Sequence, residues 1–270
     1  MNQKEAYPSD LKDHEWEILE PMIHRLTRNF DGRGRKSSYN LRDLYNGMMY
    51  ICREGSSWRG LPKDYPPYSV VFYHFSKWTR LGIFKKLNKR FRRALRKQAK
   101  KQEKASIIVV DAQSVRAGPI IGNGVDGHKC VKGRKRHILV DSLGLLMHII
   151  ISPANQSDRQ GLRQLMRSLD KQEDQLIKVL ADAGYESKTL TKELEESYQV
   201  ALETMIREAD EKGFVVKPHR WKVERAFAWL GWFRRLNKIY DQDASHEAFC
   251  YFATAQHMLK RLARTSTAWK

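Results

Sequence analysis

The chain has 270 residues, of which 41% are hydrophobic, so it is long enough to bury a substantial core. It carries 50 Lys and Arg against 31 Asp and Glu, a formal net charge of +19, which indicates a polyanionic partner and favours nucleic acid. The sequence has no apolar run near the roughly 20 residues that cross a bilayer and no apolar signal core over residues 1–9, so we expect a cytoplasmic protein without a membrane partner.

Cysteine usage agrees with this expectation. Cys52, Cys130 and Cys250 are odd in number and far apart, so they form neither a disulfide framework nor a Cys-x-x-Cys zinc pair. His128 and Cys130 together would be only half of a zinc site, and we interpret all three thiols as structural.

The first part of the chain contains three helical patterns separated by turns. The first pattern follows Asp10 as its N-cap, the second runs to Gly55, and the third covers residues 68–81. Short basic helices with tight turns are typical of helix-turn-helix modules, although other small helical domains share the pattern. We therefore predict a small all-α, helix-turn-helix-like DNA-binding domain over residues 1–83.

A glycine and arginine segment lies between the first two of these helices. It alternates small and basic residues, so its flexible backbone could approach a narrow minor groove, where negative potential attracts cations. The predicted DNA contacts in this segment are Arg33, Arg35 and Lys36.

Residues 84–104 form an amphipathic pattern, in which apolar residues recur at spacings of three and four and basic residues occupy the other faces. One interpretation is a linker helix that follows DNA phosphates, and the other is a solvated surface helix. The charge of the whole chain favours the first interpretation. Its predicted phosphate contacts are Lys89, Arg92, Arg93 and Arg96.

After residue 104 the pattern changes to strands that alternate with helices. A hairpin comes first and βα alternation follows, which predicts a mixed α/β sheet covered by helices in a domain over residues 105–270. The expected strands lie at 106–111, 134–140, 145–152, 175–182 and near 200, and the expected helices at 155–170, 189–197, 220–236 and 246–262.

Three carboxylates in this region are candidates for chemistry. Asp111 and Asp182 end two predicted strands, each beside small residues, and Glu224 lies on a helix one turn after Arg220. Strand-end aspartates are also common turn formers, and Glu224 with Arg220 could be a surface ion pair. If the three acids converge, they would bind two Mg²⁺ ions, with Mn²⁺ as a substitute, as phosphoryl transfer requires.

Other polar positions have competing interpretations. Asp141 lies in a predicted turn and is expected to be structural. Asn155 and Asp158 are expected to begin a helix, and the alternative is that they lie near the metal ions. A basic strand edge could clamp DNA or could instead protect the edge of the sheet by its charge. This edge comprises Lys132, Arg134, Lys135 and Arg136.

Several motifs in this order resemble the insertion-sequence transposases of family five, in the IS4/IS5-type group of the DDE superfamily. The similarity covers nearly the whole chain. It is carried by Val110-Asp111-Ala112-Gln113-Ser114-Val115, Lys132-Gly133-Arg134-Lys135-Arg136-His137, Ser152-Pro153-Ala154-Asn155 with Ser157-Asp158, Ala181-Asp182-Ala183-Gly184-Tyr185, Trp221-x-x-Glu224-Arg225-x-Phe227-Ala228-Trp229-Leu230 and the upstream Gly55-x-x-Trp58-Arg59-x-Leu61-Pro62 turn.

The resemblance implies an RNase H-like catalytic core in which Asp111, Asp182 and Glu224 are the three catalytic and metal-binding acids. Arg220 matches the arginine of the tyrosine-arginine-glutamate-lysine signature of the wider group. Lys217 stands at the tyrosine place and Gly231 at the lysine place, so these two DNA contacts depart from the signature. The phosphate contacts are then expected from Arg225, Arg234 or Arg235.

The function implied by the resemblance is that of a bacterial, nucleoid-associated transposase. It would bind the terminal repeats of its element and a target duplex, cut DNA and transfer strands by two-metal phosphoryl transfer, as a homodimer or larger homo-oligomer. The alternatives are a non-catalytic DNA-binding regulator on the same scaffold and a nuclease on the same core.

Overall fold

The computed structural model describes residues 7–27, 38–119, 122–169, 175–205 and 220–267. The chain divides into two compact units. The first unit is Met1–Phe91, Leu230–Asn237 and Ala244–Lys270, and the second is Arg92–Trp229 and Lys238–Asp243. None of the helices in the described ranges is long and apolar enough to cross a membrane.

The first unit is helical, as the sequence predicts. It contains α1 (Asp13–Thr27), α2 (Leu41–Glu54), α3 (Tyr68–Arg80), the start of α4 (Ile83–Gln98), most of α8 (Asp243–Thr267) and the short turns η2 (Trp58–Gly60) and η4 (Arg234–Leu236). Gly55 ends α2 with a φ of 74°, a left-handed conformation that glycine adopts without steric cost. The predicted end of α2 is therefore confirmed.

Helix α8 packs among the amino-terminal helices in this unit. The rings of Phe75 and Phe249 stack with 4.3 Å between their centroids. The Tyr45 hydroxyl donates to Gln256 Oε1 at 2.9 Å, and Asn88 Nδ2 donates to Thr254 Oγ1 at 2.8 Å. The compact units thus differ from the division expected at residues 83 and 104. That division stays a prediction, because contacts in the whole chain do not show which fragments fold alone.

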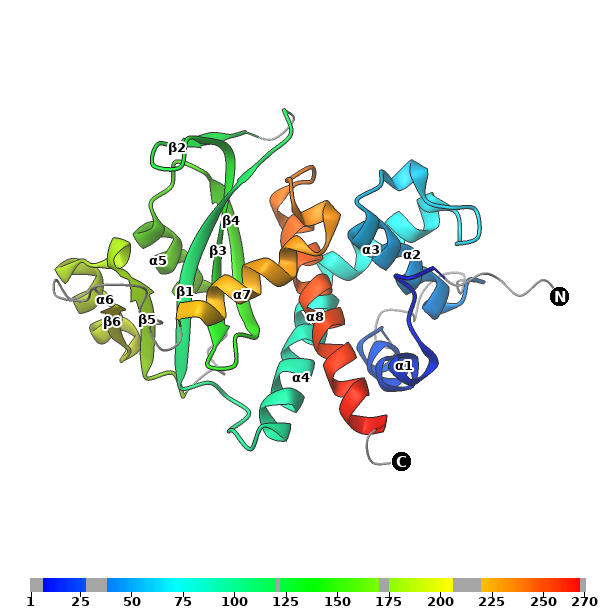
Figure 1. Cartoon of the computed structure of the whole chain (residues 1–270), viewed down its shortest axis with the longest axis horizontal. Helices are drawn as coiled ribbons and strands as arrows, with labels where there is room; N and C mark the ends of the chain where they lie inside the picture. The colour runs from blue at the N-terminus through cyan, green and yellow to red at the C-terminus, as the bar shows by residue number, and fades with distance from the viewer. Residues whose placement is uncertain (1–6, 28–37, 120–121, 170–174, 206–219, 268–270) are drawn as a thin grey trace. The chain divides into compact units, whose positions relative to one another are not determined.

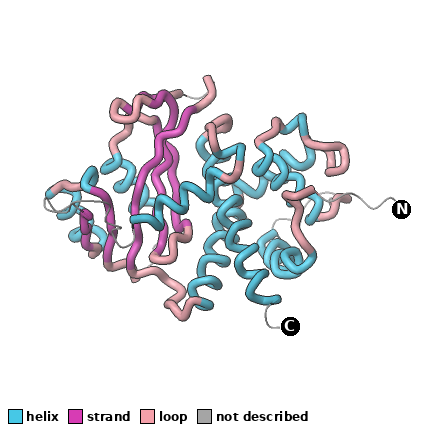
Figure 2. Tube along the Cα trace, in the orientation of Figure 1, coloured by secondary structure: helices cyan, strands magenta, loops and turns pink. Residues whose placement is uncertain are grey.

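The second unit is built on a mixed sheet, coloured magenta in Figure 2. Its strand order is β2-β3-β1-β5-β6, with β4 also paired to β3. β1 runs antiparallel to β3 and parallel to β5, which is parallel to β6, and this confirms the mixed α/β sheet expected of an RNase H-like core. The strands are β1 (Ile107–Arg116), β2 (Gly124–Asp126), β3 (Val131–Asp141), β4 (Leu146–Pro153), β5 (Lys178–Asp182) and β6 (Ala201–Met205).

Three helices accompany this sheet, α5 (Asp158–Ser168), α6 (Lys188–Tyr198) and α7 (Arg220–Gly231), and α7 passes in front of β1, β3 and β4 in Figure 1. Ser157 caps α5 by accepting a hydrogen bond from the Gln160 N–H, as expected. The sequence missed β2, and α4 ends before residue 104. Apolar side chains of the strands pack with those of α5 and α6 in one core, which includes Ile108, Val110, Leu139, Leu162, Leu165, Val179 and Leu190.

Helix α5 approaches the sheet closely at Gly161. A Cβ atom built on this glycine would lie 2.1 Å from Nδ1 of His137 on β3. His137 is fully buried, and its Nε2 lies 2.9 Å from Ser152 Oγ on β4, so the ring is fixed between the two strands. Only glycine leaves room for the helix over this ring.

A buried ion pair connects α4 with the β3–β4 turn. The Arg96 guanidinium donates to Asp141 Oδ2 at 2.8 Å, and the two side chains are 4% and 0% exposed. Asp141 Oδ1 accepts from the Leu143 and Leu145 N–H groups at 2.9 and 3.0 Å. Arg96 also donates to the carbonyl oxygens of Gln102 and Lys104. The structural role expected for Asp141 is confirmed, because its carboxylate holds the turn and the helix together.

The close approach at Gly161 predicts that Gly161→Ala destabilises the chain, by about 1–3 kcal/mol, because the methyl group must displace the buried His137 ring or the helix. A matched control is Gly231→Ala in α7, whose Cβ would meet no atom nearer than 3.8 Å. Denaturant unfolding of both variants measures the difference. Equal stability of the two variants would contradict the packing described here.

The buried pair predicts that Arg96→Gln lowers the free energy of unfolding by about 3–5 kcal/mol, because it leaves the Asp141 carboxylate buried without its cation. Lys97→Gln is the control, since Lys97 is the exposed next residue of α4 and its loss should change stability by less than about 0.5 kcal/mol. Thermal or denaturant unfolding of the full chain distinguishes the two. Similar values for both variants would show that the ion pair is not needed.

Candidate active site

Asp111 and Asp182 lie next to each other at the carboxyl end of β5. The parallel register of β1 and β5 pairs Val109 with Leu180, and each aspartate follows two residues later on its strand. Asp111 Oδ1 accepts a hydrogen bond from the Ala112 N–H at 2.7 Å, and Asp182 Oδ1 accepts one from the Gly184 N–H at 3.0 Å. Local backbone donors therefore orient both carboxylates. Asp182 ends β5 as expected, but the strand end expected at Asp111 is wrong, because β1 continues to Arg116 in its pairing with β3.

Burial and a like charge make the ionised form of Asp111 costly. Burial raises the pKa of Asp111 from its usual 3.8 to about 6, and the carboxylates of Asp182 and Asp158 add to this increase. The Ala112 N–H and the Lys129 ammonium act in the opposite direction. A cation placed between Asp111 and Asp182 would remove the repulsion that raises this pKa.

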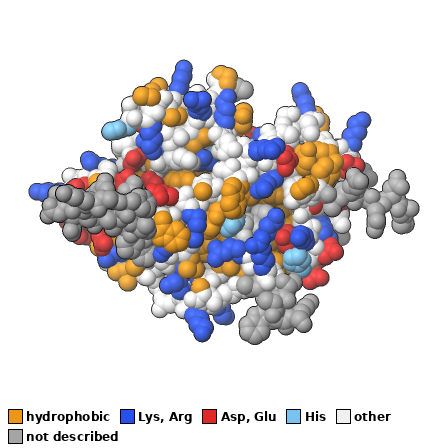
Figure 3. Space-filling view, viewed as in Figure 1, with side chains coloured by type: hydrophobic (Ala, Val, Ile, Leu, Met, Phe, Trp, Pro, Cys, Tyr) orange, Lys and Arg blue, Asp and Glu red, His pale blue; other side chains and the backbone are white. Residues whose placement is uncertain are grey.

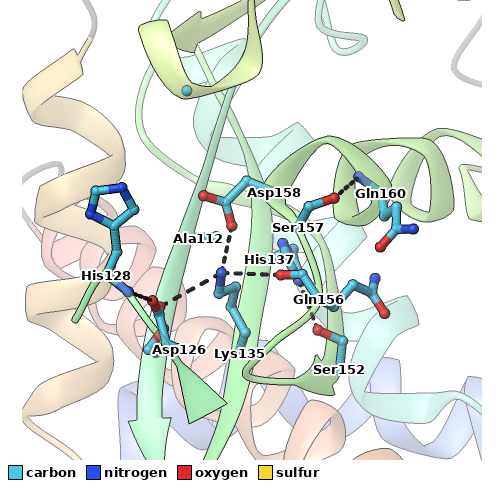
Figure 4. A network of polar contacts seen from close by, with 12 residues as sticks. Ala112, Asp126, His128, Lys135, His137, Ser152, Gln156, Ser157, Asp158 and Gln160 are labelled. Atoms are coloured by element: carbon cyan, nitrogen blue, oxygen red, sulfur yellow. Dashed lines mark hydrogen bonds and ion pairs between the residues drawn. The ribbon is translucent and has the colours of Figure 1, made fainter. Parts of the chain in front are cut away.

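A third carboxylate near these two belongs to Asp158, at the start of α5. Its Oδ1 lies 3.0 Å from Nζ of Lys135 on β3, and Lys135 also lies 3.6 Å from Asp126 Oδ2 and 3.1 Å from the Gln156 carbonyl oxygen. Figure 4 shows the ammonium group between the two carboxylates. Lys135 is 7% exposed, so it is an internal cation that fixes Asp158 beside the acid pair.

The other end of this network orders the short strand β2. Asp126 accepts hydrogen bonds from the Ser114 hydroxyl and from the N–H groups of His128 and Lys129. Burial lowers the pKa of His137, on the same strand as Lys135, to about 4, so its ring is neutral at pH 7. His137 therefore adds no positive charge beside the acids, and the cation that pairs with Asp126 and Asp158 is Lys135.

Glu224 lies apart from these acids on α7, where its side chain is exposed. The next residue, Arg225, is held between two tryptophans, with its guanidinium carbon 4.4 Å from the Trp221 ring centroid and 4.6 Å from that of Trp229. Arg225 also donates to the Leu143 carbonyl oxygen at 2.8 Å, which ties α7 to the β3–β4 turn. The described side chains do not include Arg220.

The acid pair fits a hard divalent cation in its chemistry. Mg²⁺ and Mn²⁺ prefer carboxylate oxygens, and a cation between Asp111 and Asp182 would offset the repulsion of their like charges. Within the described ranges, no three His, Cys, Asp or Glu side chains come close enough together to hold a metal ion. Asp111 and Asp182 are thus brought together, while Glu224 is not grouped with them.

The basic residues expected to contact DNA differ in how accessible they are. On α4, Arg92 and Arg96 are buried, with exposed fractions of 2% and 4%, whereas Lys89 and Arg93 are half-buried. Arg96 could reach a phosphate only by leaving Asp141. The interpretation of α4 as a helix whose basic residues all face DNA therefore fails for Arg92 and Arg96, because amphipathic spacing cannot show which cations pair inside the chain.

The basic strand edge is also largely internal. Arg134 pairs with Asp243 and donates to the Gly122 carbonyl oxygen, and Arg136 donates to Gln113 Oε1 at 2.7 Å. Arg134, Lys135 and Arg136 are all buried, while Lys132 is exposed. β3 pairs with other strands on both sides, so this segment is not an edge strand. Of the four basic residues, Lys132 is the exposed one and can therefore contact DNA without breaking the ion pairs and hydrogen bonds of the other three.

The two arginines of η4 have partners inside the first unit. Arg234 pairs with Glu54 at 3.1 Å but stays exposed. Arg235 is buried, donates to the Ser56 carbonyl oxygen at 2.9 Å, and lies over the Phe249 ring at 5.0 Å from its centroid. The expected contacts Arg33, Arg35 and Lys36 lie outside the described residues.

The sequence did not indicate that Lys135 is internal, and it offered a place for Asp158 near the metal ions only as the alternative to a helix start. The signal was present in part, because Asp158 lies within a motif that the chain shares with the family that it resembles. Aspartate is common in the first turn of a helix, and Asp158 stands there in α5. The sequence therefore did not indicate that Asp158 also forms an ion pair with Lys135.

The raised pKa of Asp111 predicts how stability changes with pH when EDTA removes divalent cations. Below pH 3.8 the carboxyl is protonated in both the folded and unfolded chains, and between 3.8 and about 6 only the folded chain keeps the proton. The proton bound to Asp111 therefore contributes to the free energy of unfolding at low pH, and this contribution is lost as pH rises through about 6. Compared with wild type, Asp111→Asn should become relatively more stable between pH 4 and 7. Parallel pH profiles from denaturant unfolding would contradict this result.

Comparisons with known proteins agree with this geometry. Residues 102–259 match the family model described as "Transposase DDE domain", and residues 11–88 match the one described as "Putative transposase of IS4/5 family". A Burkholderia cepacia protein named "Putative transposase for insertion sequence element IS402" is 33% identical over 126 residues, which are 43% of this chain. The match spans 58% of that relative's length.

Two solved structures align along most of the chain with low scores. One is a piggyBac transposase synaptic complex with hairpin DNA, with a TM-score of 0.39 and 9% identity over 99% of this chain and 70% of that chain. The other is a pre-cleavage Mos1 transpososome, with a TM-score of 0.31 and 11% identity over 98% of this chain and 90% of that chain. The family model described as "Transposase DDE domain" covers more than half of the chain, so the chain belongs to the transposase DDE domain family.

Proposed function

We propose that the chain is an active transposase that cuts DNA at the ends of an insertion sequence and joins the freed strands to a target duplex. The observation that carries this proposal is the adjacent placement of Asp111 and Asp182 in a chain of the transposase DDE domain family. A scaffold without chemistry would have no need to hold two repelling carboxylates side by side.

The reaction exchanges phosphodiester bonds. Water first hydrolyses the strand at the element end and leaves a 3′ hydroxyl group, and this hydroxyl then attacks a target phosphate in line while the target's own 3′ oxygen leaves. Two bound Mg²⁺ ions, or Mn²⁺ in their place, would stabilise the charge on the attacking and departing oxygens. No covalent bond to the protein is needed.

The residues of this chain have separate parts in the proposed site. Asp111 and Asp182 supply the hard oxygen ligands, and Glu224 is proposed as the third ligand from α7. Lys135 forms an ion pair with Asp158 and so holds its side chain in place. Since Glu224 is not grouped with the pair, we propose that α7 reaches the pair only when DNA and cations are bound.

The proposed partners are the double-stranded ends of the element and a target duplex, bound by a homodimer or a larger homo-oligomer. In Figure 3, Lys and Arg side chains are spread over much of the visible face. Among the residues proposed to touch phosphates, Lys132, Lys89, Arg93 and Arg234 keep accessible surface. Arg33, Arg35, Lys36, Arg220 and Arg225 stay proposals from the sequence.

The proposal predicts that Asp111→Asn, Asp182→Asn and Glu224→Gln each lower the rate of cleavage by on the order of a hundredfold or more, because each removes a ligand oxygen charge. The substrate is a duplex that carries the ends of the element that encodes the chain, incubated with Mg²⁺, and gel analysis separates cleaved from joined products. Glu203→Gln is the matched control, since Glu203 pairs with Lys178 on exposed strand surface and should not matter.

The products also decide between the three functions. Cleaved and joined DNA supports a transposase, and cleavage without joining would indicate a nuclease on the same core. Binding of the element ends with neither product would indicate a DNA-binding regulator. A wild-type rate in any of the three acid variants would remove that residue from the site.

A further inference from the structure

The side chain of Tyr185 connects the hydrophobic core of the second unit with the acid pair. It ends the short turn η3 (Ala183–Tyr185), which begins directly after Asp182. The residue is 1% exposed, and it belongs to the core cluster that also contains Leu162 and Leu190. The turn packs against α5, and Arg159 of that helix donates to the Gly184 carbonyl oxygen at 3.1 Å. The ring is therefore fixed by packing on both sides.

The hydroxyl group of this side chain is buried, and no residue in the described ranges forms a hydrogen bond with it. Leaving a buried hydroxyl unpaired costs about 1–3 kcal/mol, and phenylalanine would fill the same space without that cost. Packing alone thus accounts for the ring of Tyr185 but not for its oxygen.

The turn that carries Tyr185 begins at Asp182 and packs against α5, whose first turn contains Asp158. Burial raises the pKa of Tyr185 well above its usual range, and the charges of Asp158, Asp111 and Asp182 raise it further. Each of these acids has another partner already. Asp158 is held by Lys135, Asp182 by the Gly184 N–H and Asp111 by the Ala112 N–H.

We propose that Tyr185 is a positioning residue of the Asp111–Asp182 site, whose hydroxyl exchanges a hydrogen bond with a water molecule that enters with a hydrated divalent cation. Mg²⁺ and Mn²⁺ sites commonly keep several water molecules, and a fixed neutral oxygen beside the carboxylates is a suitable partner for one of them. This inference rests on the proposed function, since it assumes that the acid pair binds the cation.

The test compares Tyr185→Phe with wild type in the full chain, first without divalent cations. Because the lost hydroxyl has no partner in the described chain, the variant should unfold at the same temperature as wild type or a higher one. Tyr45→Phe is the matched control, since its hydroxyl donates to Gln256 and its loss should lower the unfolding temperature. A loss of stability in Tyr185→Phe as large as in the control would overturn the proposal, because the hydroxyl would then be bonded within the fold.

The second measurement is Mn²⁺ binding, followed by electron paramagnetic resonance of the free ion or by titration calorimetry. Tyr185→Phe should bind Mn²⁺ about tenfold more weakly than wild type, the range seen when a group that orients metal ligands is lost. Tyr45→Phe should bind it as wild type does. Wild-type affinity in Tyr185→Phe would overturn the proposal.

Two further samples separate this inference from the proposed function. Asp111→Asn and Asp182→Asn should bind Mn²⁺ far more weakly than Tyr185→Phe does. If these two lose binding while Tyr185→Phe keeps it, only the role of Tyr185 is wrong. If wild type and both aspartate variants bind Mn²⁺ equally, the proposed metal site is wrong, and the role of Tyr185 falls with it.

Discussion

The parallel pairing of β1 with β5 forces two carboxylates that repel each other into neighbouring positions. The two backbones are paired about 4.8 Å apart up to Val109 and Leu180, and each aspartate follows two residues beyond that pair. Burial then increases the cost of ionising Asp111, whose pKa is raised. The surrounding contacts, from the Gly184 N–H to the Lys135 ammonium, hold this unfavourable arrangement in place.

The large positive charge of the chain is used in two ways. Some of it stays on the surface, at residues such as Lys132 and Arg234. Another part is buried and neutralised, as in the pairs that Arg96 forms with Asp141 and Arg134 forms with Asp243. A net charge of +19 therefore overstates how many cations can face DNA, and each buried pair joins segments that the strand pairing alone leaves separate.

Most elements could be predicted from the sequence because their signals are local. Gly55 ends α2, Ser157 caps α5, and the apolar runs before Asp111 and Asp182 indicate β1 and β5 directly, although β1 continues past Asp111 to Arg116. The strand β2 was missed because three residues are too few for a pattern. The partner of Arg96 lies 45 residues away, and no spacing rule reaches that far. The position of α7 on the sheet has the same limit, since it depends on tertiary packing.

The placement of Tyr185 has a consequence for how the site tolerates change. One ring belongs both to the apolar interior and to the surroundings of Asp182, so the position of the second acid depends on the same packing that stabilises the fold. Enlarging or emptying the space around Leu190 would move the ring, and with it the turn that orients Asp182. Substitutions that never touch a charged group can thus change the geometry of the site as well as the stability of the fold.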